Sequence, residues 1–409
     1  MPYKTQHSPS MTTLSTPLAA SGLGSHYAPV CSRRINGRLA AAWSSAELED
    51  SNWDDFLEAT PLGHFQQSSL WARAKDIDGW RPLRTILTLD GQIAGGFQIL
   101  TRHTRFGLIG YVSKGPVLIK EEDGLLDFMM ELVVSAVKAN QLKALILQPP
   151  DPSTIDDLIL TRHRFLPNHL VNVVSATLLT DLSCGMDNIE RRMRKSTLVE
   201  VRQACRRGIK VRQGGELDVG TFFRLMRITC ERQQTKPAPA TESALLAVWE
   251  AFNRRGCVHL FLAEYEGAAV AGTFCLCFGD RVTIWKKGWS GQHRERHPNQ
   301  LLLFKTIEWA QQHGYKLFDF AGLNPEIAAA LLRGETLSEI QRKSRDFVHL
   351  SYGNLPMLLP ESQIYINNPL FQFAYRGVMA SCYGRTLARG LIRTCIDGLA
   401  HVDPEISAC

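Results

Sequence analysis

An internal repeat is the feature of this 409-residue chain that most limits how it can fold. The segments LTLDGQIAGG (87–96) and LAEYEGAAVAG (262–272) each place a two-residue turn between two apolar runs, a pattern typical of a β-hairpin. Each hairpin is followed by a third strand, an amphipathic helix and a buried strand, so the same element order occurs twice. This repetition predicts a duplicated α/β module. Two unrelated α/β domains that share an element order are the alternative.

The repeat divides the chain into four parts. We expect a flexible tail over residues 1–45, a first domain over 46–182, a second domain over 183–355 and a helical appendage over 356–409. The tail lacks the apolar run of a secretory signal, although a transit-like peptide is an alternative. A content of 44% hydrophobic and 21% charged residues is ordinary for a soluble globular protein. No apolar run reaches the roughly 18 residues of a membrane-spanning helix.

The ten cysteines show no metal-binding pattern. They form no CxxC pair and no Cys/His spacing of the kind that holds zinc. We therefore expect no metal site, and we expect buried, reduced thiols in a cytoplasmic compartment.

Four segments together resemble the FemABX family. They are HFQQSSLWARAK (64–75), GYVSKGPVL (110–118), MRKSTLVEVRQACRRG (193–208) and HPNQLLLFKTIEWAQQHGYKLFDFAG (297–322), and the resemblance spans about 70% of the chain. It implies an α/β fold of two tandem GNAT-like (acyl-CoA N-acyltransferase-type) domains, with mixed central sheets flanked by helices. The second domain is then of the BioF2-like acetyltransferase type.

The resemblance also implies an acyltransferase activity. Family members move an aminoacyl group from aminoacyl-tRNA to an amine acceptor, which is a peptidoglycan precursor of the cell wall in the best-known branch or a small peptide in others. The chain departs from the family in two places. Leu198 and Glu200 replace the usual Arg and Asn, and the segment IQRKSRDFVHLSY (340–352) lacks the paired glycines of the family's Phe-Lys-x-x-Phe-Gly-Gly stretch.

Aminoacyl transfer is the attack of a neutral amine on an ester carbonyl, so it needs a proton acceptor and an oxyanion stabiliser but no covalent nucleophile. Asp319 ends a predicted buried strand, where side chains line clefts in α/β sheets, and is our candidate base. A carboxylate satisfied by backbone amides is the alternative. Lys343, which we place opposite the family's lysine, is the candidate oxyanion stabiliser.

A basic segment is the candidate phosphate-binding surface. Nine Lys or Arg residues and one acid lie between residues 191 and 212, and seven of the nine fall within a predicted helix over 186–207. We single out Arg194, Lys195, Arg202 and Arg206, because arginine binds phosphate bidentately. A solvated charged face is the alternative. Lys75 is a second phosphate candidate, and it rests on the resemblance.

The predicted helix over 301–313 begins at a candidate substrate-binding position. Pro298 and Asn299 suit a helix start, and an N-terminus attracts anions. The preceding turn, QHRERHPN (292–299), has no glycine, so side chains would crowd the backbone cradle that coenzyme A needs. We therefore expect no bound cofactor, with aminoacyl-tRNA as co-substrate and acyl-CoA as the alternative donor.

Three functions remain open. The first is an aminoacyl-tRNA-dependent transferase acting on a phosphate-bearing precursor or peptide. The second is an acyl-CoA-dependent GNAT N-acyltransferase, and the third is a non-catalytic anion-binding protein on the same fold. Residues 368–399 alternate apolar residues with arginines, which suggests peripheral contact with the inner face of a membrane. A helix packed on the second domain is the alternative.

Overall fold

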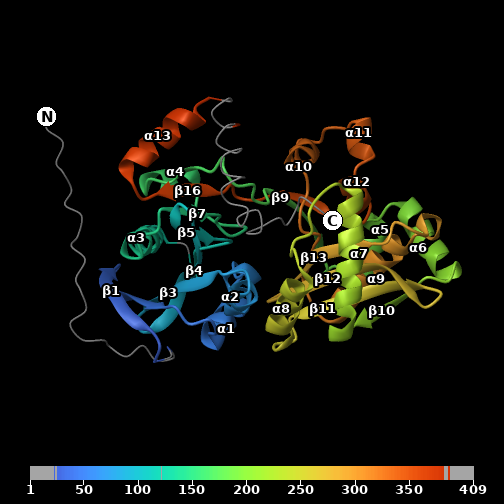
Figure 1. Ribbon diagram of the computed structural model, residues 1–409, viewed down its shortest axis with the longest axis horizontal. Helices are drawn as coiled ribbons and strands as arrows, with labels where there is room; N and C mark the ends of the chain where they lie inside the picture. The colour runs from blue at the N-terminus through green and yellow to red at the C-terminus, as the bar shows by residue number, and fades with distance from the viewer. Residues whose placement is uncertain (1–22, 24, 121, 382–385, 387–409) are drawn as a thin grey trace.

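The computed structural model describes residues 23, 25–120, 122–381 and 386, and in these it forms two α/β modules side by side (Figure 1). Module 1 is built on a nine-stranded sheet in the order β1-β2-β3-β4-β5-β7-β16-β8, with β6 paired to β4. Module 2 is built on a seven-stranded sheet in the order β10-β11-β12-β13-β14-β9-β15.

The strands of module 1 are β1 (Ala28–Ile35), β2 (Arg38–Ser45), β3 (Arg81–Leu89), β4 (Gln92–Thr104), β5 (Gly107–Val112), β6 (Val117–Leu118), β7 (Ala144–Leu147), β8 (Leu166–Pro167) and β16 (Gln363–Ile366). Its helices are α1 (Ser51–Ala59), α2 (Ser69–Asp76), α3 (Asp123–Ala139), α4 (Asp157–Arg162) and α13 (Pro369–Met379).

The strands of module 2 are β9 (Ala176–Asp181), β10 (Lys210–Gly214), β11 (Val258–Tyr265), β12 (Ala268–Phe278), β13 (Arg281–Trp289), β14 (Leu317–Asp319) and β15 (Leu355–Leu358). Its helices are α5 (Met186–Arg192), α6 (Lys195–Arg206), α7 (Val219–Arg232), α8 (Glu242–Asn253), α9 (Pro298–Gln312), α10 (Pro325–Leu332), α11 (Glu339–Arg342) and α12 (Arg345–Leu350).

The two modules share one strand arrangement, which agrees with a duplication. In each, three antiparallel strands (β3-β4-β5 or β11-β12-β13) are followed by a helix and a strand parallel to the third (β7 or β14). Both predicted hairpin turns have positive φ at their two central residues, Asp90-Gly91 and Glu266-Gly267. This is the conformation of the tight turn that matches the twist of paired strands.

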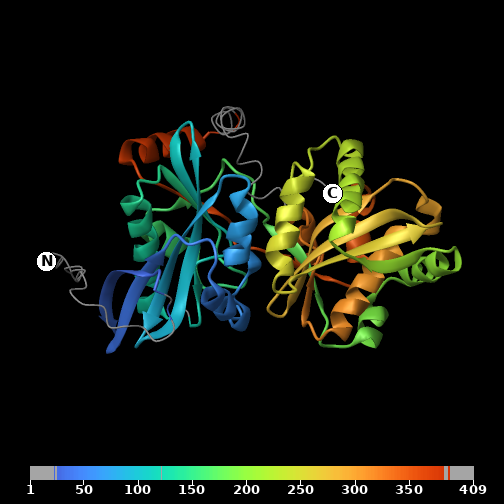
Figure 2. The ribbon, with the colours of Figure 1, turned by 60° about the horizontal axis from the view of Figure 1, so that its bottom comes forward.

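Helices and sheets alternate in layers through the molecule (Figure 2). Helix α3 covers the outer face of the first sheet, and α1 and α2 cover its inner face. Helices α7 and α8 cover the inner face of the second sheet, with α6 and α9 on its outer face. The inner helices α2 and α8 pack against each other, so one apolar core joins the modules.

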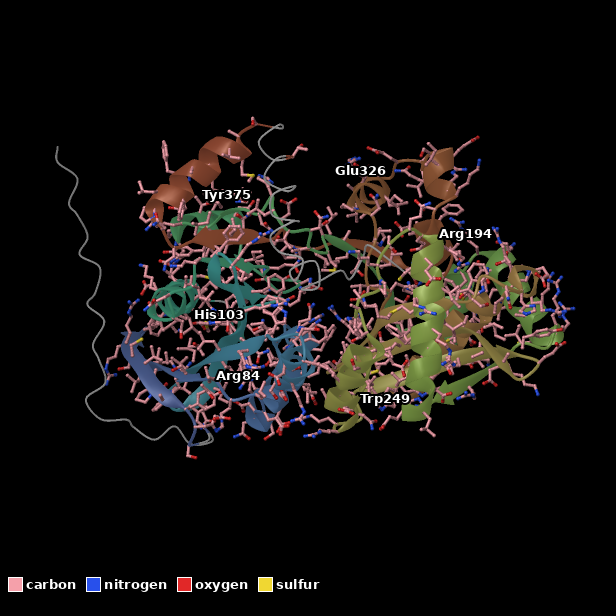
Figure 3. All side chains as sticks on the ribbon, in the orientation of Figure 1. Arg84, His103, Arg194, Trp249, Glu326 and Tyr375 are labelled. Carbon is pink, nitrogen blue, oxygen red and sulfur yellow. The ribbon has the colours of Figure 1, made fainter. Side chains whose placement is uncertain are left out.

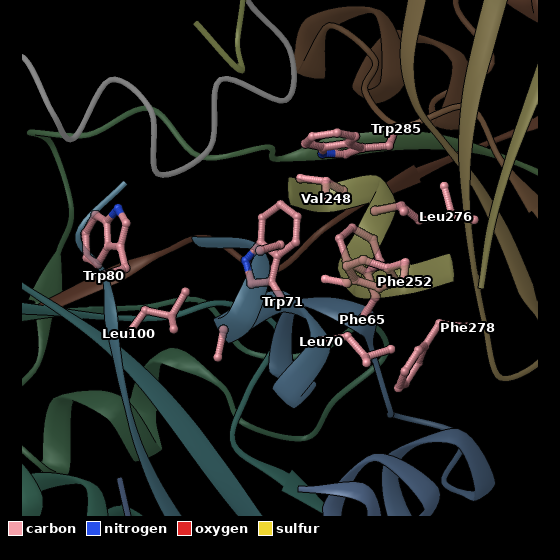
Figure 4. Close-up of a cluster of buried hydrophobic side chains, with 14 of the residues drawn as sticks. Phe65, Leu70, Trp71, Trp80, Leu100, Val248, Phe252, Leu276, Phe278 and Trp285 are labelled. Carbon is pink, nitrogen blue, oxygen red and sulfur yellow. The ribbon is translucent and has the colours of Figure 1, made fainter. Parts of the chain in front are cut away.

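Aromatic side chains form the centre of this joint (Figure 4). Trp71 of α2 meets Phe252 of α8 and Trp285 of β13 edge to face, with ring centroids 6.4 and 5.8 Å apart. Such pairs contribute about 0.5–1.5 kcal/mol beyond their buried area. At the rim, Arg255 pairs with Asp55 at 2.5 Å and with Glu58 at 3.2 Å. The aromatic packing therefore makes the two modules one body.

Three segments lie elsewhere than the sequence predicts. Residues 28–45, placed in the tail, form the hairpin β1–β2 around Asn36-Gly37, whose φ values of 51° and 81° are those of a tight hairpin turn. Strand β9, placed in the first domain, pairs with β14 and β15 in the second sheet. In its described residues the predicted appendage supplies β15 to the second sheet and β16 to the first, and α13 matches the helical expectation. Most of its remainder, including residues 387–399 of the predicted membrane-contact segment, lies outside the described residues.

Candidate functional site

A pocket of about 830 Å³ opens in module 2. Its walls are the first turns of α6 and α9, the end of α7, the end of β13 and helix α12. This volume lies within the range of small-molecule sites. The pocket is therefore the best candidate for the reactive centre.

The pocket exists because β13 and β14 separate. They pair only through Arg281–Thr283 and Leu317–Asp319, while β13 runs on for six more residues to Trp289. After β14 the chain turns toward β9, where Phe320 N–H donates to Leu178 O at 3.1 Å. The gap beside the last residues of β13 becomes the pocket floor.

Module 1 closes the equivalent gap. Beyond the last pair of β5 and β7, Gln148 N–H donates to Val112 O at 2.8 Å, and Gly115 N–H donates to Gln148 O at 3.0 Å. The two chains stay joined where β13 and β14 part. In the described part of module 1, this position therefore offers no comparable opening.

A β-bulge decides which side chain of β13 enters the pocket. Cys275 pairs with Ile284 and the adjacent Phe274 pairs with Lys286, so β13 holds one extra residue, Trp285. Beyond the bulge, Thr273 of β12 pairs with Lys287, and paired residues point to the same face. Bulges commonly reorient side chains next to active sites. Lys287 consequently lines the pocket.

Lys287 is held by a histidine from another element. Its Nζ lies 3.1 Å from Nε2 of His349, a buried residue of α12 that also lines the pocket. A lysine ammonium can only donate, so His349 accepts through Nε2. Neither Lys287 nor His349 was predicted to belong to the site. The sequence does show two adjacent lysines, Lys286 and Lys287, on a predicted strand. Without knowledge of the bulge, neither lysine could be assigned to a face of the sheet.

Positive charge surrounds the pocket. Arg194 stacks on Phe347 of α12, with its guanidinium carbon 3.6 Å from the ring centroid, and Arg232 stacks on Trp289 at 4.4 Å. Burial, reinforced by the like charge of Arg342, lowers the pKa of Arg194. Arg294 adds a third guanidinium. Stacked arginines keep their donors oriented, which suits a phosphate or carboxylate ligand.

The first turn of α9 completes the anion-binding character. Asn299 and Gln300 line the pocket as the second and third residues of the helix. Backbone N–H groups of a first helical turn have no intrahelical acceptor and carry the positive end of the helix dipole. His297 precedes the helix with a φ of 57° and also lines the pocket.

The structure brings two of the six predicted binding residues into the pocket, namely Arg194 and Asn299. The predicted single helix over 186–207 is two helices, α5 and α6, which break at Met193–Arg194. Arg194 is therefore the N-cap of α6 rather than part of a basic stripe. The pocket-facing residues of α6 are Ser196, Thr197 and Glu200.

The other predicted binding residues lie outside the pocket. Lys195, Arg202 and Arg206 are exposed on α6 and do not line the pocket. Arg202 lies eight residues after Arg194, and a helical step of that length turns a side chain by about 80°. Lys75 is buried in the joint, with Nζ 4.8 Å from the Trp71 ring centroid and 3.7 Å from Asp78. Arg202 and Arg206 therefore lie along α6 outside the pocket, and Lys75 lies in the joint between the modules.

The two predicted catalytic residues are also not in the pocket. Lys343 is exposed at the end of α11. Asp319 is buried, and its Oδ1 accepts from the Thr177 hydroxyl at 2.5 Å and from Ala321 N–H at 2.9 Å. The alternative role of a satisfied carboxylate therefore describes Asp319. Lys287, and not Lys343, lines the pocket.

Asp319 belongs to a buried chain of charges between the modules. Arg281 of β13 donates to Asp319 Oδ2 at 3.5 Å and to Asp151 Oδ2 of module 1 at 3.1 Å. Lys114 of module 1 lies 2.9 Å from the other oxygen of Asp151. Burial raises the pKa of Asp151, but Lys114 and Arg281 outweigh it and hold that pKa at about 2. Asp151 thus remains charged at neutral pH.

His64 adds a pH dependence to this joint. Burial, together with the charges of Arg281 and Lys114, lowers the pKa of His64 well below its ordinary 6.5. The unfolded chain binds a proton below pH 6.5 while the folded protein does not, so stability is present above pH 6.5 and is lost as the pH falls below it. We expect the His64→Gln variant to lose less unfolding free energy than wild type between pH 7 and 5.

Urea unfolding at several pH values measures this difference. His103→Gln is the control, because His103 is exposed. Parallel stability curves for wild type and His64→Gln would contradict the assignment.

The described residues contain neither a candidate metal site nor a candidate membrane-spanning helix. No group of three or more His, Cys, Asp or Glu residues in that part of the chain could hold a metal ion. Likewise, no helix in the described residues is long and apolar enough to cross a membrane.

Comparison with known proteins matches each module to a model of its own. Residues 48–158 match the model of the FemAB family, and residues 188–327 match that of the acetyltransferase (GNAT) domain. The crystal structure of FemX superposes with a TM-score of 0.67 at 18% identity, and the match covers 78% of this chain and 96% of that one. The first module is thus similar to the FemAB family and the second to the GNAT acetyltransferase domain. Its fold is the tandem GNAT-like architecture that the sequence predicts.

Curated relatives resemble part of the chain. The lipid II:glycine glycyltransferase of Staphylococcus haemolyticus (strain JCSC1435) is 26% identical over 232 residues, which are 54% of this chain and 55% of the relative. The enzyme of the same name from Staphylococcus aureus (strain MRSA252) is 24% identical over 233 residues, 54% of each chain. The chain thus spans about half the length of the curated relatives that it matches.

Proposed function

We propose that this protein transfers an aminoacyl group from aminoacyl-tRNA to an amine on a lipid-linked cell-envelope precursor. The observation that carries the proposal is the module 2 pocket, in which one lysine held by a histidine sits among three arginines and a helix N-terminus. The names of the curated relatives support a glycyl-type transfer to lipid II.

The pocket supplies what such a transfer needs. The acceptor amine attacks the ester carbonyl, a C–N bond forms, and the C–O bond to the tRNA ribose breaks. The amine proton passes to the departing hydroxyl, so no external reactant is required. We assign the Lys287 ammonium to the oxyanion, because donors aimed at developing charge are usually the largest catalytic contribution. His349 keeps Lys287 pointed into the pocket.

Arginines and the α9 N-terminus fit the phosphates near the acceptor end of a tRNA. Arg194, Arg232 and Arg294 border the pocket, and α9 contributes backbone donors. The exposed arginines of α6, which begin beside the pocket, then extend this surface along the tRNA backbone. Non-catalytic anion binding would not explain a lysine–histidine pair at the pocket floor.

The function is tested by offering two donor pools separately. The protein is incubated with pooled radiolabelled aminoacyl-tRNAs or with acyl-CoAs, with and without a lipid-linked peptide amine. We expect amine-dependent loss of label from the tRNA pool and a labelled amide product. Consumption of acyl-CoA alone would make the protein a GNAT N-acyltransferase, and binding without turnover of either pool would make it a binding protein.

The exposed arginines of α6 give a prediction for the donor. We expect the double variant Arg202→Ala/Arg206→Ala to weaken tRNA use, with the slope of log KM against log salt reduced by about 2, or about 1 per lost phosphate contact. Steady-state kinetics over a salt series measures this slope. Arg333→Ala is the matched control, because Arg333 is an exposed arginine at the C-terminal end of α10. An unchanged slope in the double variant would remove α6 from the tRNA surface.

A further inference from the structure

Helix α13 presents an apolar surface to solvent. Leu370, Phe371 and Phe373 are 78%, 68% and 80% exposed, and Ala374, Gly377 and Val378 are exposed as well. On a helix with 100° between residues, these six positions span an arc of about 160°. No acidic residue occurs in α13, and Arg376 is its one basic residue.

The polarity of α13 is the reverse of an ordinary surface helix, which buries its apolar stripe. Its inward side carries the buried Met379 and two polar side chains that hydrogen-bond to module 1. Gln372 accepts from Arg164 Nη2 and donates to Arg164 O, each at 2.8 Å. The hydroxyl of Tyr375 donates to Pro167 O at 2.8 Å and accepts from His169 N–H at 3.1 Å. These bonds fix the orientation that turns the phenylalanines outward.

A basic hollow lies next to this helix. It has a volume of about 260 Å³ and is lined by Lys138, Arg162, His163, Arg164 and Tyr365 together with Glu131, Val134 and Ser135. Arg164 joins the hollow to α13 through Gln372. Two acids offset part of this charge. Glu131 pairs with Arg33, outside the hollow, at 2.6 Å, and Asp127 pairs with Arg162 at 3.1 Å. Lys138 and Arg164 leave the hollow positively charged.

We propose that α13 and this hollow dock the protein on an anionic lipid bilayer. The apolar arc enters the headgroup region, as interfacial amphipathic helices do, while a lipid phosphate sits against Lys138 and Arg164. The charge of the hollow complements such a surface. The docking is separate from acyl transfer, because α13 lies in module 1, far from Arg194 of the pocket (Figure 3). It would hold the protein beside a lipid-linked acceptor.

A second copy of the chain fits this surface less well. An 11-residue helix is about 16 Å long and about 10 Å wide, so its outward face offers on the order of 200 Å². A stable protein interface needs about 800 Å² from each partner. Insertion of one short helix into a bilayer needs no such area.

Vesicle sedimentation tests the proposal with the full-length protein. We expect pelleting with vesicles of phosphatidylglycerol and phosphatidylcholine, and much weaker pelleting with phosphatidylcholine alone. Phe371→Ser/Phe373→Ser should reduce binding at least tenfold, and Lys138→Ala should reduce the phosphatidylglycerol dependence. Both phenylalanines are exposed, so circular dichroism and the Tm should match wild type.

Leu217→Ser is the matched control, because Leu217 is 99% exposed in module 2. It should bind vesicles like wild type. The proposal is overturned if wild type does not pellet with either vesicle, or if Leu217→Ser loses as much binding as the double variant. It is also overturned if light scattering shows a wild-type dimer that the double variant abolishes, since the arc would then be a protein interface.

Discussion

Replacing Lys287 by Met should lower kcat of aminoacyl transfer about 10²–10³-fold, with a much smaller change in donor KM. Loss of one preorganised oxyanion donor typically has this effect on kcat. Methionine keeps most of the side-chain volume and removes only the charge and the donors. The measurement is single-turnover transfer from labelled aminoacyl-tRNA to an amine acceptor.

Lys343→Met is the control for this experiment. Lys343 is the lysine that sequence resemblance favours, but it is exposed and does not line the pocket. We expect its replacement to leave kcat within about twofold of wild type, as for a surface substitution without special contacts. If Lys343→Met abolished transfer and Lys287→Met did not, the assignment of the reactive centre to the end of β13 would be wrong.

Replacing Arg281 by Met should destabilise the protein by about 3–5 kcal/mol, the usual effect of removing one partner from a buried ion pair. Asp151 has a side chain only 2% exposed and lies 3.1 Å from Arg281. Without Arg281, Lys114 is the one remaining ion-pair partner of Asp151 among the described residues, and Asp319 loses its ion pair with Arg281. Because Asp151 and Asp319 come from different modules, the joint itself should weaken.

Urea unfolding followed by tryptophan fluorescence measures this loss. Lys316→Ala is the control, because Lys316 pairs with Asp280, the residue before Arg281, and both side chains are over 60% exposed. Exposed pairs contribute about 0–1 kcal/mol. We also expect that adding Asp319→Asn to the Arg281→Met variant recovers part of the stability that Arg281→Met loses. Equal losses for Arg281→Met and Lys316→Ala would show that the buried chain of charges does not hold the modules together.

The fold was predictable from the sequence because its signals are local. Tight turns at Asp90-Gly91 and Glu266-Gly267 and apolar runs of strand length each depend on a few neighbouring residues. What the sequence hides is which sheet a strand joins. Strands β9 and β16 pair with strands far away along the chain, and no local pattern records that choice.

The candidate site was less predictable, for two physical reasons. Regular alternation from Ile284 would place Lys286 beside Thr273, and the bulge at Trp285 moves Lys287 there instead. A bulge arises from tertiary packing, here of Trp285 against Trp71 of the other module. The second reason is the break at Met193–Arg194, which places Arg194 in the pocket and turns Arg202 and Arg206 away.

The most direct measurement is binding of a donor analogue to the module 2 pocket. The analogue is an aminoacyl-adenosine whose ester is replaced by an amide, and its effect on the Tm is recorded for wild type and for Ser196→Trp. Ser196 is an exposed residue that lines the pocket, so tryptophan there should fill the site without disturbing the core. We predict that the analogue raises the Tm of wild type, as a ligand of the folded state must, and leaves that of Ser196→Trp unchanged. An equal rise in both proteins would place the donor outside this pocket and contradict the account.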